Sequence, residues 1–314
     1  MERPVKRNEK ITALIENMER VIIGKRQVIE LVVTAMLAEG HVLIEDVPGV
    51  GKTQLVSALA HSCGGVFHRL QLTPDVMPSD VTGFTMVNSA DHSMEFRQGA
   101  AFCNFLLADE INRASPKSQS ALLEIMEENQ VSMDGVTHRL PSPFMVLATQ
   151  NPVETYGTYH LPEAQLDRFL MKLTMGYPGR ENELAILRRG EESLPQGLEQ
   201  VLSCQDILSM IGEAGEVRCS ERIEEYIVDI VEATRNAQEI RLGVSPRGSV
   251  ALHRVSKAYA YVCGRSYVLP DDIKLLAPYV LAHRILLTSG GKAELESPEK
   301  AIEHILTKVA VPVT

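Results

Sequence analysis

The sequence predicts an α/β protein: a phosphate-binding core built on a parallel sheet, followed by a smaller helical domain. Three observations predict it. Short apolar runs alternate with helical patterns over roughly the first 175 of the 314 residues. A glycine-rich loop links the first apolar run to the helix behind it. Beyond about residue 180 the apolar residues follow the helical period instead.

Three compact apolar runs are the expected strands of the core. They occupy residues 41–44, 104–108 and 144–148, and each is bounded by polar or turn residues. Near-continuous apolar runs of this length are typical of parallel strands that are buried on both faces. A helix over 118–128 should lie between two of them, because Ser115 and Pro116 supply its N-cap and first turn.

Two β-hairpins are expected to interrupt the core. Residues 84–96 predict a small hairpin that turns through 88–92. Residues 131–138 predict a second one, since Asp134-Gly135 between alternating residues is among the strongest short-range hairpin signals.

Gly176, Pro178 and Gly179 mark the end of the core. Apolar residues then recur at helical spacing over 223–231 and 252–259, and Pro270 with two acidic residues opens a further helix. We therefore expect a nucleotide-binding core over 1–180 and an all-helical lid domain over 181–314.

Composition excludes several classes of protein. The five cysteines are scattered without a C-x-x-C pair, and no apolar run approaches the roughly 18 residues that span a bilayer. Together with a charged N-terminus that has no apolar segment behind it, this predicts a cytoplasmic protein with reduced thiols and no membrane span. The formal net charge of −10 makes a broad nucleic-acid-binding face unlikely, because such a face needs clustered Lys and Arg.

The loop over residues 45–53 has the sequence context of a P-loop, with a strand before it and a helix after it. Its glycines let backbone N–H groups surround phosphate oxygens, and the helix N-terminus adds a favourable partial charge. We expect Lys52 to reach the β- and γ-phosphates of ATP and Thr53 to bind Mg²⁺. Asp46 stands where the usual pattern has its first glycine. The competing interpretation is an ordinary glycine-rich strand–helix turn.

Polar side chains follow the other two strands. Asp109 and Glu110 end the run at 104–108; Asp109 suits the Mg²⁺ shell and Glu110 suits polarising the attacking water. Asn151, after the third run, is placed to orient that water. Alone, each could be a polar strand end entering a loop, but beside a P-loop they predict a catalytic site.

Two arginines complete the set of candidates. Arg168 precedes an apolar segment, and Arg247 lies at the expected start of a helix, where a cation opposes the helix dipole unless an anion is near. Taken singly, either arginine could be a solvated surface residue.

Together these stretches resemble the AAA+ ATPases and, among them, the MoxR family of the helix-2-insert group. The resemblance covers almost the whole chain and keeps the order of the motifs. The matching segments are 45–53, 72–80, 109–114, 122–128, 149–152, 161–169 and 245–247.

The resemblance implies a role for each motif. Asn151 would be the sensor-1 residue, Arg168 the arginine finger and Arg247 the sensor-2 arginine. The two hairpins would be the helix-2 insert and the pre-sensor-1 hairpin, which face a central pore in related proteins. The residues implied to contact the nucleotide, through the adenine-pocket turn at 21–24 and the phosphate loop, are Ile22, Ile23, Gly24, Pro48, Gly49, Val50, Gly51, Lys52, Thr53 and Gln54.

The resemblance also implies a hexameric ring, because an arginine finger acts on a neighbour's ATP. Family members act on protein complexes with von Willebrand factor A domain proteins, so such a protein and a substrate complex are the expected partners. Two other classes compete with this chaperone-like ATPase: a DNA-acting motor of the helicase or chelatase type, and a nucleotide-gated scaffold with little turnover. DNA-stimulated turnover would favour the first, and absence of phosphate release the second.

Overall fold

A computed structural model describes residues 8–88, 92–152, 158–189 and 198–312. The core is a parallel sheet of β1 (Val42–Glu45), β2 (Phe67–Gln71), β5 (Phe105–Asp109), β8 (Met145–Gln150) and β9 (Met171–Leu173). Its strand order is β2-β5-β8-β1-β9, so β1 and β5 flank β8. All three apolar runs form strands, which confirms the predicted α/β class. The mostly polar β2 and the three-residue β9 were not predicted as strands.

The sheet is covered by helices, as the burial of its strands requires. They are α1 (Glu9–Glu19), α2 (Arg26–Leu37), α3 (Lys52–Ser62), the short α4 (Pro78–Thr82), α5 (Pro116–Glu128) and the short α6 (Glu163–Leu166). The predicted start of α5 is confirmed: Pro116 is its first residue, and the Ser115 side chain accepts a hydrogen bond from the Ser118 amide.

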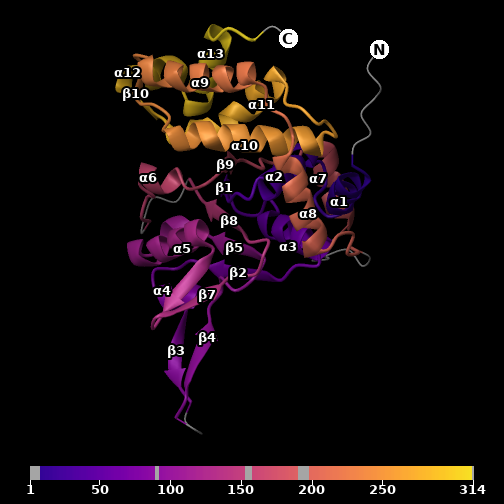
Figure 1. Ribbon diagram of the computed structural model, residues 1–314, viewed down its shortest axis with the longest axis vertical. Coiled ribbons are helices and arrows are strands. Elements are labelled where there is room, and N and C mark those ends of the chain that lie inside the picture. Colours follow the sequence, from indigo (N-terminus) through magenta and orange to yellow (C-terminus); the bar gives the residue numbers. More distant parts are fainter. Residues whose placement is uncertain (1–7, 89–91, 153–157, 190–197, 313–314) are drawn as a thin grey trace.

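Both predicted hairpins are present. β3 (Gly83–Val87) pairs with β4 (Met94–Gln98), and the ribbon projects away from the core (Figure 1). Part of its predicted turn, residues 89–91, lies outside the described residues. In the second hairpin β6 (Gln130–Met133) pairs with β7 (Val136–Arg139). Its turn residues Asp134 and Gly135 both have positive φ, at 50° and 79°, as the Asp-Gly signal predicts.

The C-terminal part is mainly helical, and most of its helices form a layer against the core (Figure 1). It contains α7 (Arg180–Arg189), α8 (Cys204–Gly215), α9 (Glu221–Asn236), α10 (Pro246–Val262), α11 (Pro270–Leu281), α12 (Ser289–Leu295) and α13 (Pro298–Lys308). A small antiparallel pair, β10 (Ile240–Leu242) with β11 (Leu286–Leu287), was not predicted in this part of the chain. The boundary between residues 180 and 181 remains a prediction.

One large cluster of buried apolar side chains runs through both parts of the chain, so the helical layer is packed onto the core. α10 contacts α2 of the core as well as α8, α9 and α11. Among the described residues, no helix has the length and apolar character needed to cross a bilayer.

Candidate nucleotide-binding site

The loop after β1 has the backbone of an anion-binding turn. Gly49 and Gly51 have φ of +85° and +92°, a region that side-chain-bearing residues rarely adopt. Gly51 is the N-cap of α3 and has no side chain with which to cap the first N–H groups of the helix. These N–H groups and the helix dipole are therefore available to a phosphate.

Asp46, the irregular first position of the loop, has a structural role. Its side chain is buried and accepts two backbone hydrogen bonds, from the Val47 amide at 2.8 Å and from the Gly176 amide at 2.6 Å. Glycine could make neither bond. Asp46 therefore ties the loop to the segment that leads toward α7.

A cavity of about 370 Å³ opens at this loop and at the carboxyl ends of β5 and β8. That is where parallel α/β sheets bind ligands. The Lys52 ammonium lies at its edge and donates to the Asp46 carbonyl at 3.0 Å. The cavity is lined by Pro48, Gly49, Gly51, Lys52, Thr53, Gln54, Arg69, Gln71, Asp109, Glu110 and Asn151.

The structure thus brings together nine of the residues predicted to act in catalysis or in nucleotide and metal binding: Pro48, Gly49, Gly51, Lys52, Thr53, Gln54, Asp109, Glu110 and Asn151. Thr53 and Asp109 supply a hydroxyl and a carboxylate, the oxygen ligands that Mg²⁺ prefers. Among the described residues, Asp109 Oδ1 accepts a hydrogen bond from Thr149 Oγ1 at 2.6 Å and Oδ2 accepts one from Arg69 at 2.6 Å, which leaves acceptor capacity on both oxygens. The donor set therefore fits Mg²⁺.

Thr149, at the end of β8, joins the two acidic residues. Its hydroxyl donates to Asp109 Oδ1 and accepts a hydrogen bond from the Glu110 amide at 2.8 Å. The sequence interpretation gave Thr149 no role. β5 and β8 are neighbouring parallel strands, so the end of β8 lies beside the end of β5. Knowledge of the strand order would therefore have placed Thr149 next to Asp109 and Glu110.

Glu110 has an unusual backbone conformation, with φ of 59° in the left-handed region. Such strain in a residue other than glycine is found mainly at functional sites. Glu110 Oε2 accepts hydrogen bonds from Gln71 Nε2 of the side-chain amide at 2.8 Å and from Arg113 at 3.1 Å. Gln71 and Arg69 come from β2, so their part in the site was also missed.

The two predicted catalytic arginines lie together, but not at this cavity. In the described part of the chain, Arg168 and Arg247 line a separate cavity of about 310 Å³, and both pair with Glu127 at the end of α5. Arg168 lies 3.3 Å from Glu127 Oε2, and Arg247 donates to Oε1. Arg247 is the second residue of α10, so Glu127 is the anion that its position at a helix N-terminus calls for.

The segment that carries Arg168 is anchored to the helical layer. Asp167 pairs with the buried Arg284 at 2.5 Å and accepts a hydrogen bond from Ser245 at 3.0 Å. Burial lowers the pKa of Arg284 to about 10, and Asp167 opposes that shift, so the guanidinium remains charged at neutral pH. Arg168 and Arg247 are therefore held on one rigid surface.

None of the residues of the predicted adenine-pocket turn, 21–24, lines the phosphate cavity. Ile22 is buried in the main apolar cluster, Ile23 is partly exposed, and Gly24 has φ of +72° under the Asn182 side chain. The adjacent Lys25 donates to the carbonyls of Met175 and Tyr177, at 2.5 Å and 2.9 Å. Val50 of the loop packs against the same apolar cluster.

A five-stranded parallel sheet, a P-loop with acidic residues at the neighbouring strand ends and a helical lid define an ATPase of the AAA class. Residues 41–171 match the family model described as ATPase family associated with various cellular activities, and residues 232–305 match that of the AAA lid domain. The chain is 52% identical over 300 residues to the uncharacterized protein YeaC of Bacillus subtilis, covering 95% of this chain and 94% of that one.

The chain is also 42% identical to the chaperone MoxR1 of Mycobacterium tuberculosis, with 95% of this chain and 81% of the relative covered. The identity to protein MoxR of Paracoccus denitrificans is 31%, with 93% of each covered. A crystal structure of a candidate ATPase from Cytophaga hutchinsonii superposes with a TM-score of 0.90 at 42% identity, covering 97% and 96% of the two chains. The chain belongs to the MoxR family of AAA+ ATPases.

Proposed function

We propose that the protein hydrolyses ATP in a Mg²⁺-dependent reaction at the cavity between the P-loop and the ends of β5 and β8. The observation that carries this proposal is the convergence of Lys52, Asp109 and Glu110 on one cavity. Lys52 would hold the β- and γ-phosphates, and Asn151 would orient the attacking water. Glu110 would accept the water's proton.

Mg²⁺ would be held by Thr53 and Asp109, and when bound it would neutralise charge on the phosphates. The turn at 21–24 would close over the adenine, while the loop from Pro48 to Gln54 would surround the phosphates. Burial of Ile22 and the left-handed backbone of Gly24 support a fixed turn at that edge of the site.

Phosphate release with and without Mg²⁺ tests the activity directly. Glu110→Gln should bind ATP normally and lose most hydrolysis, because it keeps the shape of the side chain but not its basicity. Lys52→Ala should lose nucleotide binding. Hydrolysis at the parent rate by Glu110→Gln would show that the base is wrongly assigned.

We propose further that the active unit is a hexameric ring. Arg168 and Arg247 line a cavity apart from the chain's own phosphate cavity, and this separation supports their action on a neighbouring subunit's nucleotide. Such an arginine is worth about 10³–10⁵ in rate. Turnover per subunit should therefore rise with protein concentration, and constant turnover in a monomeric sample would contradict the ring.

For its cellular role we propose a chaperone-like remodelling factor in the cytoplasm. Similarity to the relative named chaperone MoxR1 supports this role. The expected partners are a von Willebrand factor A domain protein and a target protein complex. A pull-down with Glu110→Gln in ATP should retain both, and recovery of neither partner from the source cell would count against this role.

A further inference from the structure

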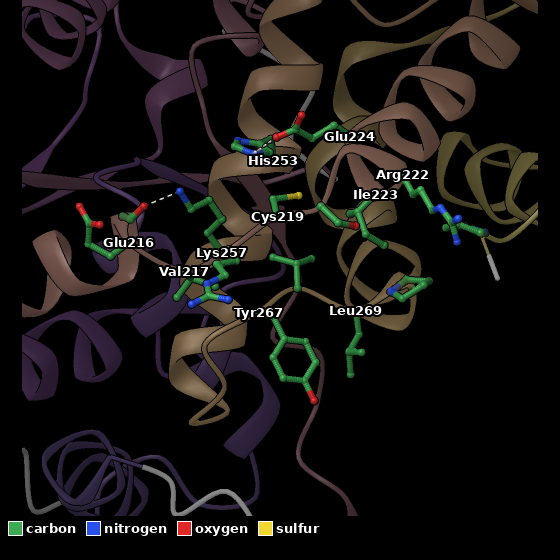
Figure 2. Close-up of a pocket in the computed structure, with 16 residues that line it drawn as sticks. Glu216, Val217, Cys219, Arg222, Ile223, Glu224, His253, Lys257, Tyr267 and Leu269 are labelled. Carbon is green, nitrogen blue, oxygen red and sulfur yellow. Dashed lines mark hydrogen bonds and ion pairs between the residues drawn. The ribbon is translucent and has the colours of Figure 1, made fainter. Parts of the chain in front are cut away.

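A second large cavity lies in the helical part of the chain. It has a volume of about 720 Å³ and opens between the loop before α9, the first turns of α9, the middle of α10 and the loop before α11 (Figure 2). No residue of the proposed nucleotide site lines it.

Three side chains of metal-binding type meet at the wall of this cavity. Cys219 precedes α9, Glu224 lies in the first turns of α9, and His253 lies on α10. Their Sγ, carboxylate oxygen and ring nitrogen atoms all lie within 4.8 Å of one another. His253 Nε2 lies 3.4 Å from Glu224 Oε1.

Separations of this size fit a metal centre. Zinc bond lengths of about 2.0–2.3 Å in a tetrahedron place ligand atoms about 3.3–3.8 Å apart. The His253–Glu224 distance is already in that range. The Glu224 side chain is 53% exposed, so a rotamer change can bring its oxygen into position.

The backbone that carries these ligands is fixed independently of any metal. The Arg218 amide donates to the Ser266 carbonyl at 3.0 Å, and the Val268 amide donates to the Arg218 carbonyl at 2.9 Å, which clamps the residue before Cys219. The Glu224 amide closes the first turn of α9 on the Ser220 carbonyl at 3.0 Å. His253 lies on α10, which packs against α9.

The neighbouring cations point elsewhere. Lys257 donates to the Gly215 carbonyl, and Figure 2 shows it directed away from the three ligands. Arg222 extends from the opposite side of the cavity, also away from them (Figure 2). Of the charged groups that act on Cys219, the Glu224 carboxylate has the larger effect, and the Lys257 ammonium opposes it.

We propose that Cys219, Glu224 and His253 bind one transition-metal ion of the Zn²⁺ class, with its fourth coordination position open to the cavity. A thiolate, an imidazole and a carboxylate select such an ion over Mg²⁺ or Ca²⁺, which prefer sets of oxygen ligands. The metal displaces the thiol proton of Cys219, which passes to solvent. The ion then links the start of α9 to α10, and the open position takes a water or a donor atom from a partner.

A reactive cysteine is the competing interpretation of this cavity, and it fits less well. Burial, and to a smaller extent the charge of Glu224, raises the pKa of the Cys219 thiol to about 11. The metal-free side chain is therefore a thiol at neutral pH and a poor nucleophile.

The experiment uses tag-free, reduced, full-length protein that has been stripped of metal. Titration with Co²⁺ should give one equivalent of thiolate-to-cobalt charge transfer and the ligand-field bands of a tetrahedral site. Zn²⁺ should displace the Co²⁺, whereas excess Mg²⁺ should not. By mass action Zn²⁺ should also raise the melting temperature.

Three variants decide the assignment of the ligands. Cys219→Ser and His253→Ala should each weaken Zn²⁺ binding by at least about a hundredfold, since even second-shell changes cost about 10–100-fold. Cys219→Ser should also abolish the charge-transfer band. Asp109→Asn should leave binding unchanged, because it alters only the proposed Mg²⁺ site.

Matched controls keep the result interpretable. Cys204→Ser and His304→Ala make the same chemical changes at half-buried positions on other elements, and both should bind Zn²⁺ as the parent does. Absence of Co²⁺ charge transfer in the parent protein, or unchanged Zn²⁺ affinity in Cys219→Ser and His253→Ala, would overturn the proposal. If Cys219→Ser is unstable without metal, His253→Ala decides it alone.

Discussion

At the scale of single residues, Thr149 links the two acidic groups of the nucleotide site. Thr149→Val keeps the shape of the side chain but removes the donor to Asp109 Oδ1 and the acceptor for the Glu110 amide. A lost buried partner costs about 1–3 kcal/mol. We expect turnover to fall about 10–100-fold as Glu110 loses its position.

Phosphate release and nucleotide binding measure this effect separately. The affinity for ATP should stay within about twofold, because Thr149 is not among the residues that line the phosphate cavity. Thr149→Ser keeps the hydroxyl and should retain most activity. Full activity in Thr149→Val would mean that the strained backbone of Glu110 is held by other contacts.

Glu127 is the second residue whose role rests on geometry. It pairs with both Arg168 and Arg247, so in the ring it would compete with a neighbour's γ-phosphate for them. Glu127→Gln removes the negative charge. We expect half-maximal turnover at a lower protein concentration, by about two- to tenfold, since exposed pairs of this kind are worth about 0.2–1 kcal/mol each.

Turnover measured across a dilution series tests the role of Glu127. Glu128→Gln is the matched control. Glu128 is the next residue along the chain, is exposed and makes neither the ion pair with Arg168 nor the one with Arg247. A rise in the concentration needed for half-maximal turnover would instead indicate that Glu127 positions the two arginines for catalysis.

The sequence predicted the acidic residues of the nucleotide site but not the residues that pair with them. Asp109 and Glu110 follow a run that is plainly a buried strand, and parallel strands place their carboxyl ends at one edge. Arg69 and Gln71 lie on β2, in which three of the five residues are polar and most are half-buried, so no apolar pattern marked it as a strand. Glu127 could not be paired with Arg168 and Arg247, because that contact depends on how the lid packs.

At the scale of elements, His41 connects three parts of the core. It precedes β1, its Nε2 donates to the Met126 carbonyl on α5 at 2.8 Å, and its Nδ1 accepts a hydrogen bond from the Val146 amide on β8 at 3.0 Å. One ring nitrogen therefore donates and the other accepts, which requires a neutral ring. Burial, with a smaller contribution from Arg254, lowers the pKa of His41 from 6.5 to about 4.

The lowered pKa of His41 makes folding depend on pH. Between pH 6.5 and 4 the unfolded chain takes up a proton that the folded chain excludes, so stability is complete above pH 6.5 and is lost as pH falls. The loss is about 1.4 kcal/mol per pH unit, on the order of 3 kcal/mol in all. His283, whose pKa burial lowers to about 3, adds a similar dependence.

Denaturant unfolding at several pH values measures this slope. His41→Gln should be less stable at pH 7.5. Its free energy of unfolding should also depend less steeply on pH, with about half of the slope from the two histidines lost. His160→Gln, at an exposed position, should leave the slope as it is in the parent. An unchanged slope in His41→Gln would show that His41 is not held neutral in the folded protein.

Elements with strong local signals were predictable, and those that depend on tertiary pairing were not. The β6–β7 turn is encoded by two adjacent residues, and the start of α5 by a serine and a proline. β9, β10 and β11 are two or three residues long, too short for any period to be read. They exist because neighbouring chain segments complete their hydrogen bonds.

At the scale of the whole molecule, the phosphate cavity and the paired arginines lie at separate places on one packed body. The apolar cluster that joins core and lid makes it costly for Arg168 to swing into the chain's own phosphate cavity. The proposed ring accounts for this arrangement, because identical chains that meet head to tail would each supply arginines to the next.

Mixing two inactive variants tests this arrangement. Arg168→Ala keeps the phosphate cavity but lacks the arginine, whereas Lys52→Ala keeps the arginine but lacks nucleotide binding. In a random equimolar ring, roughly a quarter of the interfaces join an intact cavity to an intact arginine. Hydrolysis should therefore return to a clear fraction of the parent rate on mixing. A mixture no more active than its components would mean that Arg168 acts within its own chain or not at all. If Arg168 acts within its own chain, no pairing of subunits can restore what each variant lacks.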